Sequence, residues 1–242
     1  MEKRELLRRV REAGVVGEGG AGFPAHVKYD AQVQTVIANG CECEPLLYTD
    51  QHTMRRHAPE IVAAVQAVMA AMGAGRGIVA IKRKYVEIAG LFEAALAGTG
   101  IELAQLENFY PAGDEHVLVH ELLGRAIPPL GLPRDVGAVV SNVGTLLSVH
   151  RALQGRPVTH RPVTVTGEVA RPGVLTVPVG ASADACVAAC GGATVPDPVY
   201  LLGGRRLGDR IALGTAVVGA YAGGTLFAAP LRRPLDPDRL NA

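Results

Sequence analysis

The residues best suited to chemistry begin with a glycine-rich stretch, residues 14–28, which reads GVVGEGGAGFPAHVK. Five glycines fall within nine residues, and glycine lets the backbone adopt positive φ and lets a ligand approach closely. Successive N–H groups exposed in this way form a nest that favours an anion such as a phosphate, and Lys28 can add a positive charge. The stretch therefore predicts a loop that cradles a phosphorylated cofactor, although a flexible surface loop is the plain alternative.

Part of this stretch, GEGGAG at residues 17–22, also matches the G-x-G-x-x-G fingerprint of dinucleotide-binding folds. That fingerprint follows a strand, whereas residues 2–13 have the pattern of a charged helix. Pro24 stands where the helix after the fingerprint should already be running. We therefore expect a cofactor loop that is not the Rossmann turn.

Three further segments carry polar side chains beside small residues, each directly after a predicted strand. They are residues 39–45 (NGCECEP), 110–115 (YPAGDE) and 141–145 (SNVGT). Each alone could be an ordinary turn, with Asp114 and Ser141 as helix caps. In a parallel sheet, however, the loops after the strands lie at one edge, where ligands bind. Together with the glycine-rich stretch, these segments favour a shared binding site.

The acidic residues of these segments are Glu42, Glu44, Asp114 and Glu115. They could be solvated charges at helix starts. Around one cleft they would repel a phosphate, so they suit hydrogen bonds to ribose or ribityl hydroxyls, or to an isoalloxazine or carboxamide edge. The basic run at residues 82–84 reads as a solvated strand end. No Ser-His-Asp order indicates a hydrolytic triad.

The cysteines form two distant pairs, Cys41 with Cys43 and Cys186 with Cys190. Neither pair has the C-x-x-C spacing of common metal and cluster motifs. Small buried thiols in a reduced, cytoplasmic protein are the expectation. A metal or cluster site built from all four is the alternative.

Strand and helix patterns alternate through to about residue 155. Strands are expected at 31–38, 78–82, 101–109 and 137–141, and helices at 2–13, 57–72, 86–97, 114–123 and 143–153. This alternation predicts a layered, Rossmann-like α/β domain with a mostly parallel sheet over residues 1–155.

The character of the sequence changes after that point. A hairpin is expected at 162–178, a short helix at 181–190, and strands at 199–202 and 223–229. A small sheet around one helix predicts a β-grasp or similar α+β domain over residues 156–230. Residues 231–242 are rich in Pro, Arg and Asp and are expected to form a flexible tail.

The composition excludes several classes of protein. The 242 residues are 48% hydrophobic, enough for a core, and the net charge of +1 gives no argument for a nucleic-acid partner. No apolar run approaches about eighteen residues without glycine or charge, so we expect no integral membrane protein. The charged N-terminus lacks the apolar segment of a secretory signal, which favours a cytoplasmic location.

The segments GxGGAGFPxxxK, NGxExEP, YPxGxE and NVGT, in this order, resemble the flavin-binding core of the RnfC and PduS group. The large NADH-binding flavoprotein subunit of respiratory complex I is similar but more distant. The resemblance covers about residues 10–155. The next segment, RPVTVTGEVARPGVLTVPVG from Arg161, resembles the SLBB β-grasp module that follows that core. The segment ANGCECEPLL at residues 38–47 is most similar to the PduS-type cobalamin reductases.

The resemblance implies an FMN site at which NADH is the electron donor. The positions that match cofactor-binding residues of the family are Gly17, Gly19, Gly20, Lys28, Asn39, Glu42, Tyr110, Asp114, Glu115, Ser141 and Asn142. Those that match residues touching NADH are Phe23, Glu44 and Glu115. The chemistry would belong to the flavin, so no side chain is expected to act as a catalytic acid or base and no metal is expected. Glu18 departs from the complex I pattern, which has Arg at that position.

The implied function is that of an NADH-dependent FMN oxidoreductase, which passes electrons to a partner cluster, quinone or corrinoid. Family members continue into cysteine-rich motifs that hold iron–sulfur clusters, and this chain carries no such motif. The acceptor is therefore expected on an iron–sulfur or other partner protein, unless the chain is a fragment. The protein would be cytoplasmic or peripheral to a membrane or microcompartment complex. The alternative is a non-catalytic binding module for a corrinoid, a nucleotide or a protein.

Overall fold

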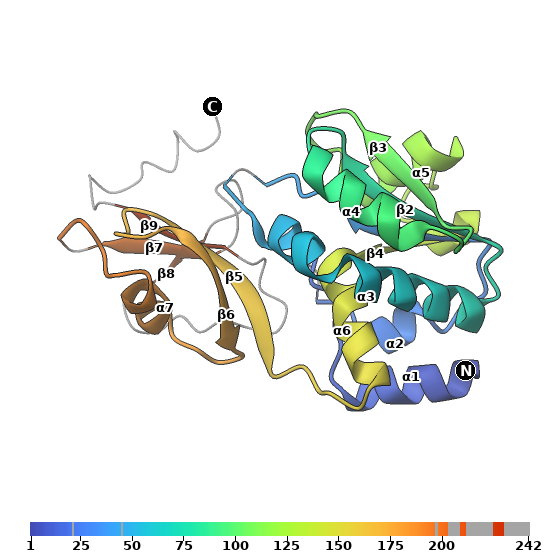
Figure 1. Ribbon diagram of the computed structural model, residues 1–242, viewed down its shortest axis with the longest axis horizontal. Helices are drawn as coiled ribbons and strands as arrows, with labels where there is room; N and C mark the ends of the chain where they lie inside the picture. Colours follow the sequence, from blue (N-terminus) through green and yellow to red (C-terminus); the bar gives the residue numbers. More distant parts are fainter. Residues whose placement is uncertain (21, 45, 197, 203–208, 212–224, 230–242) are drawn as a thin grey trace.

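The computed structural model describes residues 1–242 except 21, 45, 197, 203–208, 212–224 and 230–242. Two β-sheets lie side by side, and the segment after helix α6 joins them (Figure 1). The tail predicted at 231–242 lies outside the described residues.

The first sheet has four parallel strands in the order β3-β2-β1-β4. They are β1 (Thr35–Gly40), β2 (Arg76–Lys82), β3 (Glu102–Leu106) and β4 (Ala138–Asn142). Ile37 at the centre of β1 pairs with Ile78 on one side and Val140 on the other. The chain passes from β1 to β2 and β3 in one direction and then returns beyond β1 to form β4. Strand order therefore reverses between β1 and β4, and ligands of such sheets bind outside the carboxyl ends at this point.

Helices cover both faces of this sheet, because strand residues alternate between two cores. The first core packs against residues such as Val36 and Val79. Its helices are α1 (Lys3–Glu12), α2 (Ala25–Lys28), α3 (Thr49–Met72), α4 (Val86–Leu96) and α6 (Val143–Leu153). The second core packs against Ile37 and Ile78, and its helices are α5 (Glu115–Leu123) and the 3-10 helix η1 (Pro133–Val136). Connections between parallel strands are right-handed as a rule. The connection from β3 back to β4 runs in the opposite direction to those from β1 to β2 and from β2 to β3, so its helices lie on the other face of the sheet.

The second sheet is mixed and has the strand order β6-β5-β9-β7-β8. The strands are β5 (His160–Gly167), β6 (Gly173–Pro178), β7 (Val199–Leu202), β8 (Asp209–Ile211) and β9 (Thr225–Ala229). Only the β5–β9 pair is parallel among the pairs of this sheet that the structure describes. Helix α7 (Ala183–Ala189) packs its Cys186 and Val187 against Val163 and Val165 of β5. A parallel α/β sheet followed by a small sheet with one helix confirms the predicted fold class.

Helix α3 differs most from the expectation, which placed its start at residue 57. The helix begins at Thr49 and is interrupted at His57, whose φ of −136° and ψ of 25° are not helical. Pro59 lacks an N–H, and its ring clashes with the carbonyl group of the preceding turn, so the helix kinks just before it. The predicted helix is the part after this kink.

Smaller differences occur at strand ends. The strand expected at 31–38 starts later, at Thr35, and continues to Gly40. The strand expected at 101–109 ends at Leu106, because a turn with a hydrogen bond from the Phe109 amide to the Glu107 carbonyl follows it. Lys82 is only 5% exposed, so the solvated strand end expected at this residue is wrong. It is buried because β2 is an inner strand of the sheet.

Candidate functional site

The glycine-rich loop (residues 14–24) follows helix α1 and not a strand, as the sequence predicted. The two arms of the loop are joined where the Gly17 amide donates to the Phe23 carbonyl at 2.8 Å. The tip carries Gly19 and Gly20, which are both exposed. Gly20 has a φ of +116°, which residues with a Cβ rarely adopt, and a Cβ there would meet no atom within 4 Å. The loop is therefore closed at its base and open at its tip.

The glycine-rich loop is attached to the turn between β4 and α6. The Glu18 amide donates to Thr145 Oγ1 at 2.9 Å. A Cβ built on Gly19 would lie 3.7 Å from the Cβ of Asn142, which is ordinary van der Waals contact. Two segments that are more than a hundred residues apart in sequence therefore lie against each other.

The loop after β1 is bonded to the turn before α5. Asn39 Nδ2 donates to the Gly113 carbonyl at 2.8 Å, and the Gly113 amide donates to Cys43 Sγ at 2.8 Å. A Cβ on Gly113 would overlap the carbonyl oxygen of Cys41. Only glycine therefore allows this close approach of the two backbones.

Asp50, in the first turn of α3, joins the loops after β1 and β4. Its Oδ2 accepts from Asn142 Nδ2 at 2.7 Å, and its amide donates to Glu42 Oε1 at 3.0 Å. Asn142 also caps α6, since its Oδ1 accepts from the Gly144 amide at 2.8 Å. The segments singled out from the sequence are thus linked by hydrogen bonds into one structure. We call it the loop edge, and it comprises the described residues of the ranges 14–24, 39–50, 107–115 and 141–145, which leave out residues 21 and 45.

Two carboxyl groups lie close together at the loop edge. Glu42 is only 8% exposed, and its Oε2 has no hydrogen-bond partner among the described residues. Burial raises the pKa of Glu42 to about 7, although hydrogen bonds from Asp50 and Gln51 and the charge of Lys82 oppose the shift. Burial and the neighbouring Glu42 raise the pKa of Asp50 well above its usual value. The pair therefore retains a proton near neutral pH.

Ser141 and Lys28 make contacts that the sequence did not predict. The Ser141 hydroxyl is 3.0 Å from the Tyr29 hydroxyl, to which it is hydrogen-bonded, and Ser141 is 2% exposed. Asn142, and not Ser141, caps α6, so that predicted cap is wrong. Lys28 Nζ donates to the Val140 carbonyl at 2.9 Å. Burial lowers the pKa of Lys28, and the Glu115 carboxylate opposes this shift. Contact of either side chain with a phosphate stays a prediction.

The outer part of the loop edge carries aromatic and acidic residues. Tyr110 is 53% exposed and Phe23 is 45% exposed, so both present ring surface to solvent. Asp114 accepts hydrogen bonds from two backbone amides in the first turn of α5, which confirms its predicted role as a cap. Glu44 and Glu115 are half-buried. The predicted cofactor roles of these five residues are not tested by their positions alone.

Sequence reasoning missed Asp50 and Cys43. An acid in a first helical turn is a recognisable signal, but the helix was expected to start after Asp50. Cys43 was interpreted as a small apolar residue, whereas its sulfur accepts the Gly113 amide. No local sequence pattern predicts the bond between Gly113 and Cys43, because it joins residues that are far apart in sequence.

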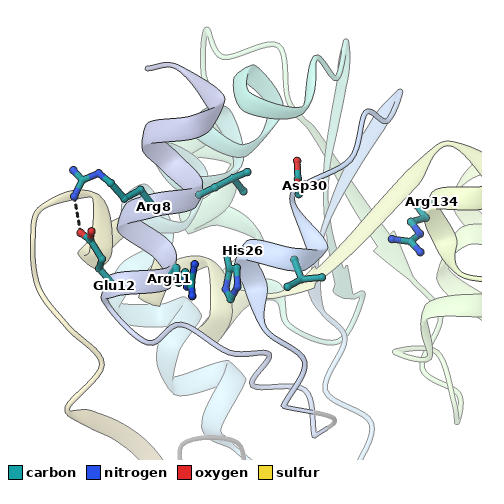
Figure 2. A pocket seen from close by; sticks show the side chains of 8 residues that line it. Arg8, Arg11, Glu12, His26, Asp30 and Arg134 are labelled. Carbon is teal, nitrogen blue, oxygen red and sulfur yellow. Dashed lines mark hydrogen bonds and ion pairs between the residues drawn. The ribbon is translucent and has the colours of Figure 1, made fainter.

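A separate hollow of about 650 Å³ lies beside α1 and α2 (Figure 2). Arg11, His26 and Arg134 line it, and Arg8 is paired with Glu12. None of the predicted cofactor or NADH residues lines this hollow. It is therefore distinct from the loop edge.

The polar groups of the loop edge suit a phosphorylated organic cofactor. In the described part of the chain, no group of three or more His, Cys, Asp or Glu is placed to hold a metal. The Gly19 and Gly20 amides donate no hydrogen bond to another described residue. They could accept an anion, while the buried Glu42 Oε2 could accept from a hydroxyl or a ring N–H.

A parallel sheet with cofactor-type loops at its carboxyl edge defines an α/β cofactor-binding domain. Residues 10–151 match the Nuo51 FMN-binding domain, and residues 162–209 match the SLBB domain. The chain belongs to the family of the Nuo51 FMN-binding domain, which confirms the resemblance found in the sequence. The domain boundary predicted near residue 155 falls between the two matches and stays a prediction.

Curated relatives cover nearly the whole chain. Cobalamin reductase PduS of Citrobacter freundii is 46% identical over 226 residues, which make up 93% of this chain and 50% of the relative. One component of the proton-translocating ferredoxin:NAD(+) oxidoreductase complex of Clostridium ljungdahlii is 37% identical over 211 residues, or 85% of this chain and 46% of the relative. The chain thus spans about half the length of these relatives.

Solved structures show the same fold. A chain of the NAD+-reducing NiFe-hydrogenase in the H2-reduced state aligns with a TM-score of 0.79 at 22% identity, over 96% of this chain and 47% of that chain. At this identity the likeness supports the fold alone. Within the described residues, no helix has both the length and the apolar character needed to cross a membrane.

Proposed function

We propose that the chain binds FMN at the loop edge, receives hydride there from NADH, and passes electrons on to a partner. The observation that carries this proposal is the buried Glu42 Oε2, which has no hydrogen-bond partner among the described residues. A buried acceptor without a donor is costly, and it lies where strand order reverses, the usual place for a ligand. A donor on a bound cofactor would remove that cost.

The residues present fit FMN at both ends. At the ring and ribityl end, Glu42 offers the acceptor and Asn39 fixes the loop beside it through Gly113. At the phosphate end, the open amides of Gly19 and Gly20 can form an anion nest. We assign the ribityl and ring contacts to the first group and the phosphate contacts to the second.

Bound FMN supplies the chemistry, because a flavin can take up a hydride and release electrons singly. The chain's residues would orient it and exclude water. The exposed rings of Phe23 and Tyr110 offer apolar surface that could cover a planar ligand. Glu44 and Glu115 are the acceptors we assign to the dinucleotide. The Glu42–Asp50 pair, which retains a proton near neutral pH, keeps the negative charge beside the ring low.

We propose that the electron acceptor lies on a partner protein. One relative is named a cobalamin reductase and another belongs to a ferredoxin:NAD(+) oxidoreductase complex. These names support an iron–sulfur protein or a corrinoid as acceptor. We place the protein in the cytoplasm, free or peripheral to such a complex.

The test is reconstitution. Purified protein is mixed with FMN, passed through gel filtration and examined for flavin absorbance, and NADH is then added without oxygen. We expect retained flavin and loss of its visible absorbance with NADH. Retained flavin that NADH does not bleach would remove the dinucleotide part of the proposal and favour a binding module. Protein that emerges without flavin would overturn the proposal.

A further inference from the structure

A charged side chain of the second sheet reaches the loop edge. Arg161, at the start of β5, has a side chain that is only 2% exposed. Its Nη2 lies 4.0 Å from Oε2 of Glu18 in the glycine-rich loop, and the Glu18 side chain is 8% exposed. At this distance the contact is electrostatic and not a hydrogen bond. A buried guanidinium from one sheet thus faces a buried carboxylate beside the other.

Glu18 is held against the first turns of α6. Its Oε1 accepts from the Ser148 hydroxyl at 2.6 Å, and its amide donates to Thr145 Oγ1. A Cβ on Gly144 would lie 2.8 Å from Glu18 Oε2, so any larger residue there would displace the carboxylate from its present position. The amino end of a helix attracts anions. The Glu18 carboxylate therefore occupies part of the region in which a phosphate near the glycine-rich loop would be stabilised.

Arg161 also acts on Asp50. Burial lowers the pKa of Arg161, and the carboxylates of Glu18 and Asp50 oppose that shift. In turn, Arg161 is among the groups that lower the pKa of Asp50. One guanidinium thus lies in the field of acids from two segments of the loop edge. Without it, Glu18 would be a buried charge next to the proposed phosphate position, at a cost in free energy.

The position of Arg161 is fixed by the strand that carries it. Three residues further along β5, Thr164 Oγ1 accepts from the Tyr48 amide at 3.1 Å. The Thr164 and Thr49 hydroxyls are hydrogen-bonded to each other at 2.9 Å. These contacts attach β5 to the start of α3, which also carries Asp50. The guanidinium is therefore supplied by a regular strand anchored to the loop edge and not by a loose surface residue.

We propose that Arg161 is a positioning residue of the cofactor site, which neutralises Glu18 and so allows the glycine-rich loop to accept the phosphate of FMN. The inference rests on the proposed function and adds the second sheet to the site. Its consequence is that the preference for a phosphorylated flavin depends on the summed charge of Arg161 and Glu18. A flavin without a phosphate should be almost indifferent to that charge.

The experiment compares FMN with riboflavin, which lacks the phosphate, by titration of flavin fluorescence. The variants are Arg161→Gln, Glu18→Gln and the double variant. We expect Arg161→Gln to weaken FMN binding about tenfold while riboflavin binding changes less than about threefold. Glu18→Gln should raise the FMN-to-riboflavin preference. The double variant, whose summed charge equals that of the parent, should return close to the parent preference.

Arg55→Gln is the matched control, because it removes an exposed arginine paired with Glu87 outside the loop edge. It should leave both affinities unchanged. If Arg161→Gln does not fold, the double variant is compared with Glu18→Gln alone. Against that background the loss of Arg161 should still lower the preference for FMN.

The outcomes separate this inference from the proposed function. A parent protein that binds neither flavin overturns the proposed function, and this inference with it. A parent that binds FMN, with an Arg161→Gln variant that loses FMN and riboflavin in equal measure, overturns only the inference and leaves Arg161 a structural role. A double variant that retains the full FMN defect of Arg161→Gln also overturns the inference.

Discussion

Asn142 at the end of β4 donates a hydrogen bond of 2.7 Å from its Nδ2 to Oδ2 of Asp50 in the first turn of α3. This bond spans the point at which strand order reverses between β1 and β4. The same Asn142 side chain caps α6 through its Oδ1. One amide therefore fixes the start of two helices and ties the acidic loop after β1 to the turn that supports the glycine-rich loop.

The first prediction concerns this amide. Asn142→Ala removes the cap of α6 and leaves the Asp50 carboxyl without its donor, so we expect a loss of about 1–2 kcal/mol in the free energy of unfolding. FMN affinity should fall as well, because the glycine-rich loop lies against this turn. Urea denaturation and flavin titration give the two values.

Ser182→Ala is the matched control for this variant. Ser182 caps α7, the helix packed on the second sheet, by accepting from the Ala185 amide at 3.2 Å, and it is far in sequence from the loop edge. It should lose stability of the same order and keep FMN affinity. If the two variants lost FMN affinity equally, the effect of Asn142 would be one of general stability.

The second prediction concerns the close approach at Gly113. Gly113→Ala places a Cβ on the carbonyl oxygen of Cys41, so the turn must move away from the loop after β1. The bonds to Asn39 and Cys43 are then lost, and we expect a clear fall in melting temperature and weaker FMN binding.

Gly90→Ala provides the comparison for Gly113→Ala. Gly90 lies within α4, a Cβ there meets no atom within 4 Å, and alanine favours a helix over glycine by about 1 kcal/mol. The melting temperature should stay level or rise. An unchanged melting temperature in Gly113→Ala would show that the described contact between the two backbones is incorrect.

The third prediction uses the raised pKa of Glu42. The folded protein has this pKa at about 7, above the ordinary value of 4.5, so the folded state holds the proton more tightly. Stability from this group is full at acid pH and is lost as the pH rises to about 7, by on the order of 3 kcal/mol. Asp50, whose pKa is also raised, changes stability in the same direction. Glu42→Gln should therefore flatten the dependence of stability on pH.

Denaturation at a series of pH values between about 5 and 8 measures the dependence of stability on pH. This interval of about three pH units contains the titration of Glu42. Glu93→Gln, which changes an exposed glutamate on α4, is the control and should follow the parent curve. A Glu42→Gln variant with the parent's slope would mean that this carboxyl is not buried in solution.

Much of the fold could be predicted because its signals are local. The strand pattern that leads into Asn39 and the acid that opens α5 at Asp114 are each visible within a few residues. Spaced motifs then placed the loops at one edge, since parallel strands present their carboxyl ends together. These features depend on periodicity and turn chemistry, which a single sequence carries.

The remaining parts of the site depend on contacts between distant segments. Asp50 belongs to a helix whose start was misplaced because Pro59 resembles a first-turn proline and masks the turns before the kink. Lys82 looks like a solvated end until the sheet order shows β2 to be an inner strand. Arg161 lies on another sheet altogether, and nothing near it in sequence points to Glu18.

The last prediction tests the tip of the glycine-rich loop. Gly19→Val should fold normally, because Gly19 is exposed and its Cβ would make only ordinary contact with Asn142. The branched side chain would, however, stand beside the open amides of Gly19 and Gly20, where we place the FMN phosphate. We expect stability within about 0.5 kcal/mol of the parent and a loss of flavin retention in gel filtration. Gly173→Val, at an open position at the start of β6, should keep both properties. Flavin retained by Gly19→Val as by the parent would place the phosphate elsewhere and remove the glycine-rich loop from the site.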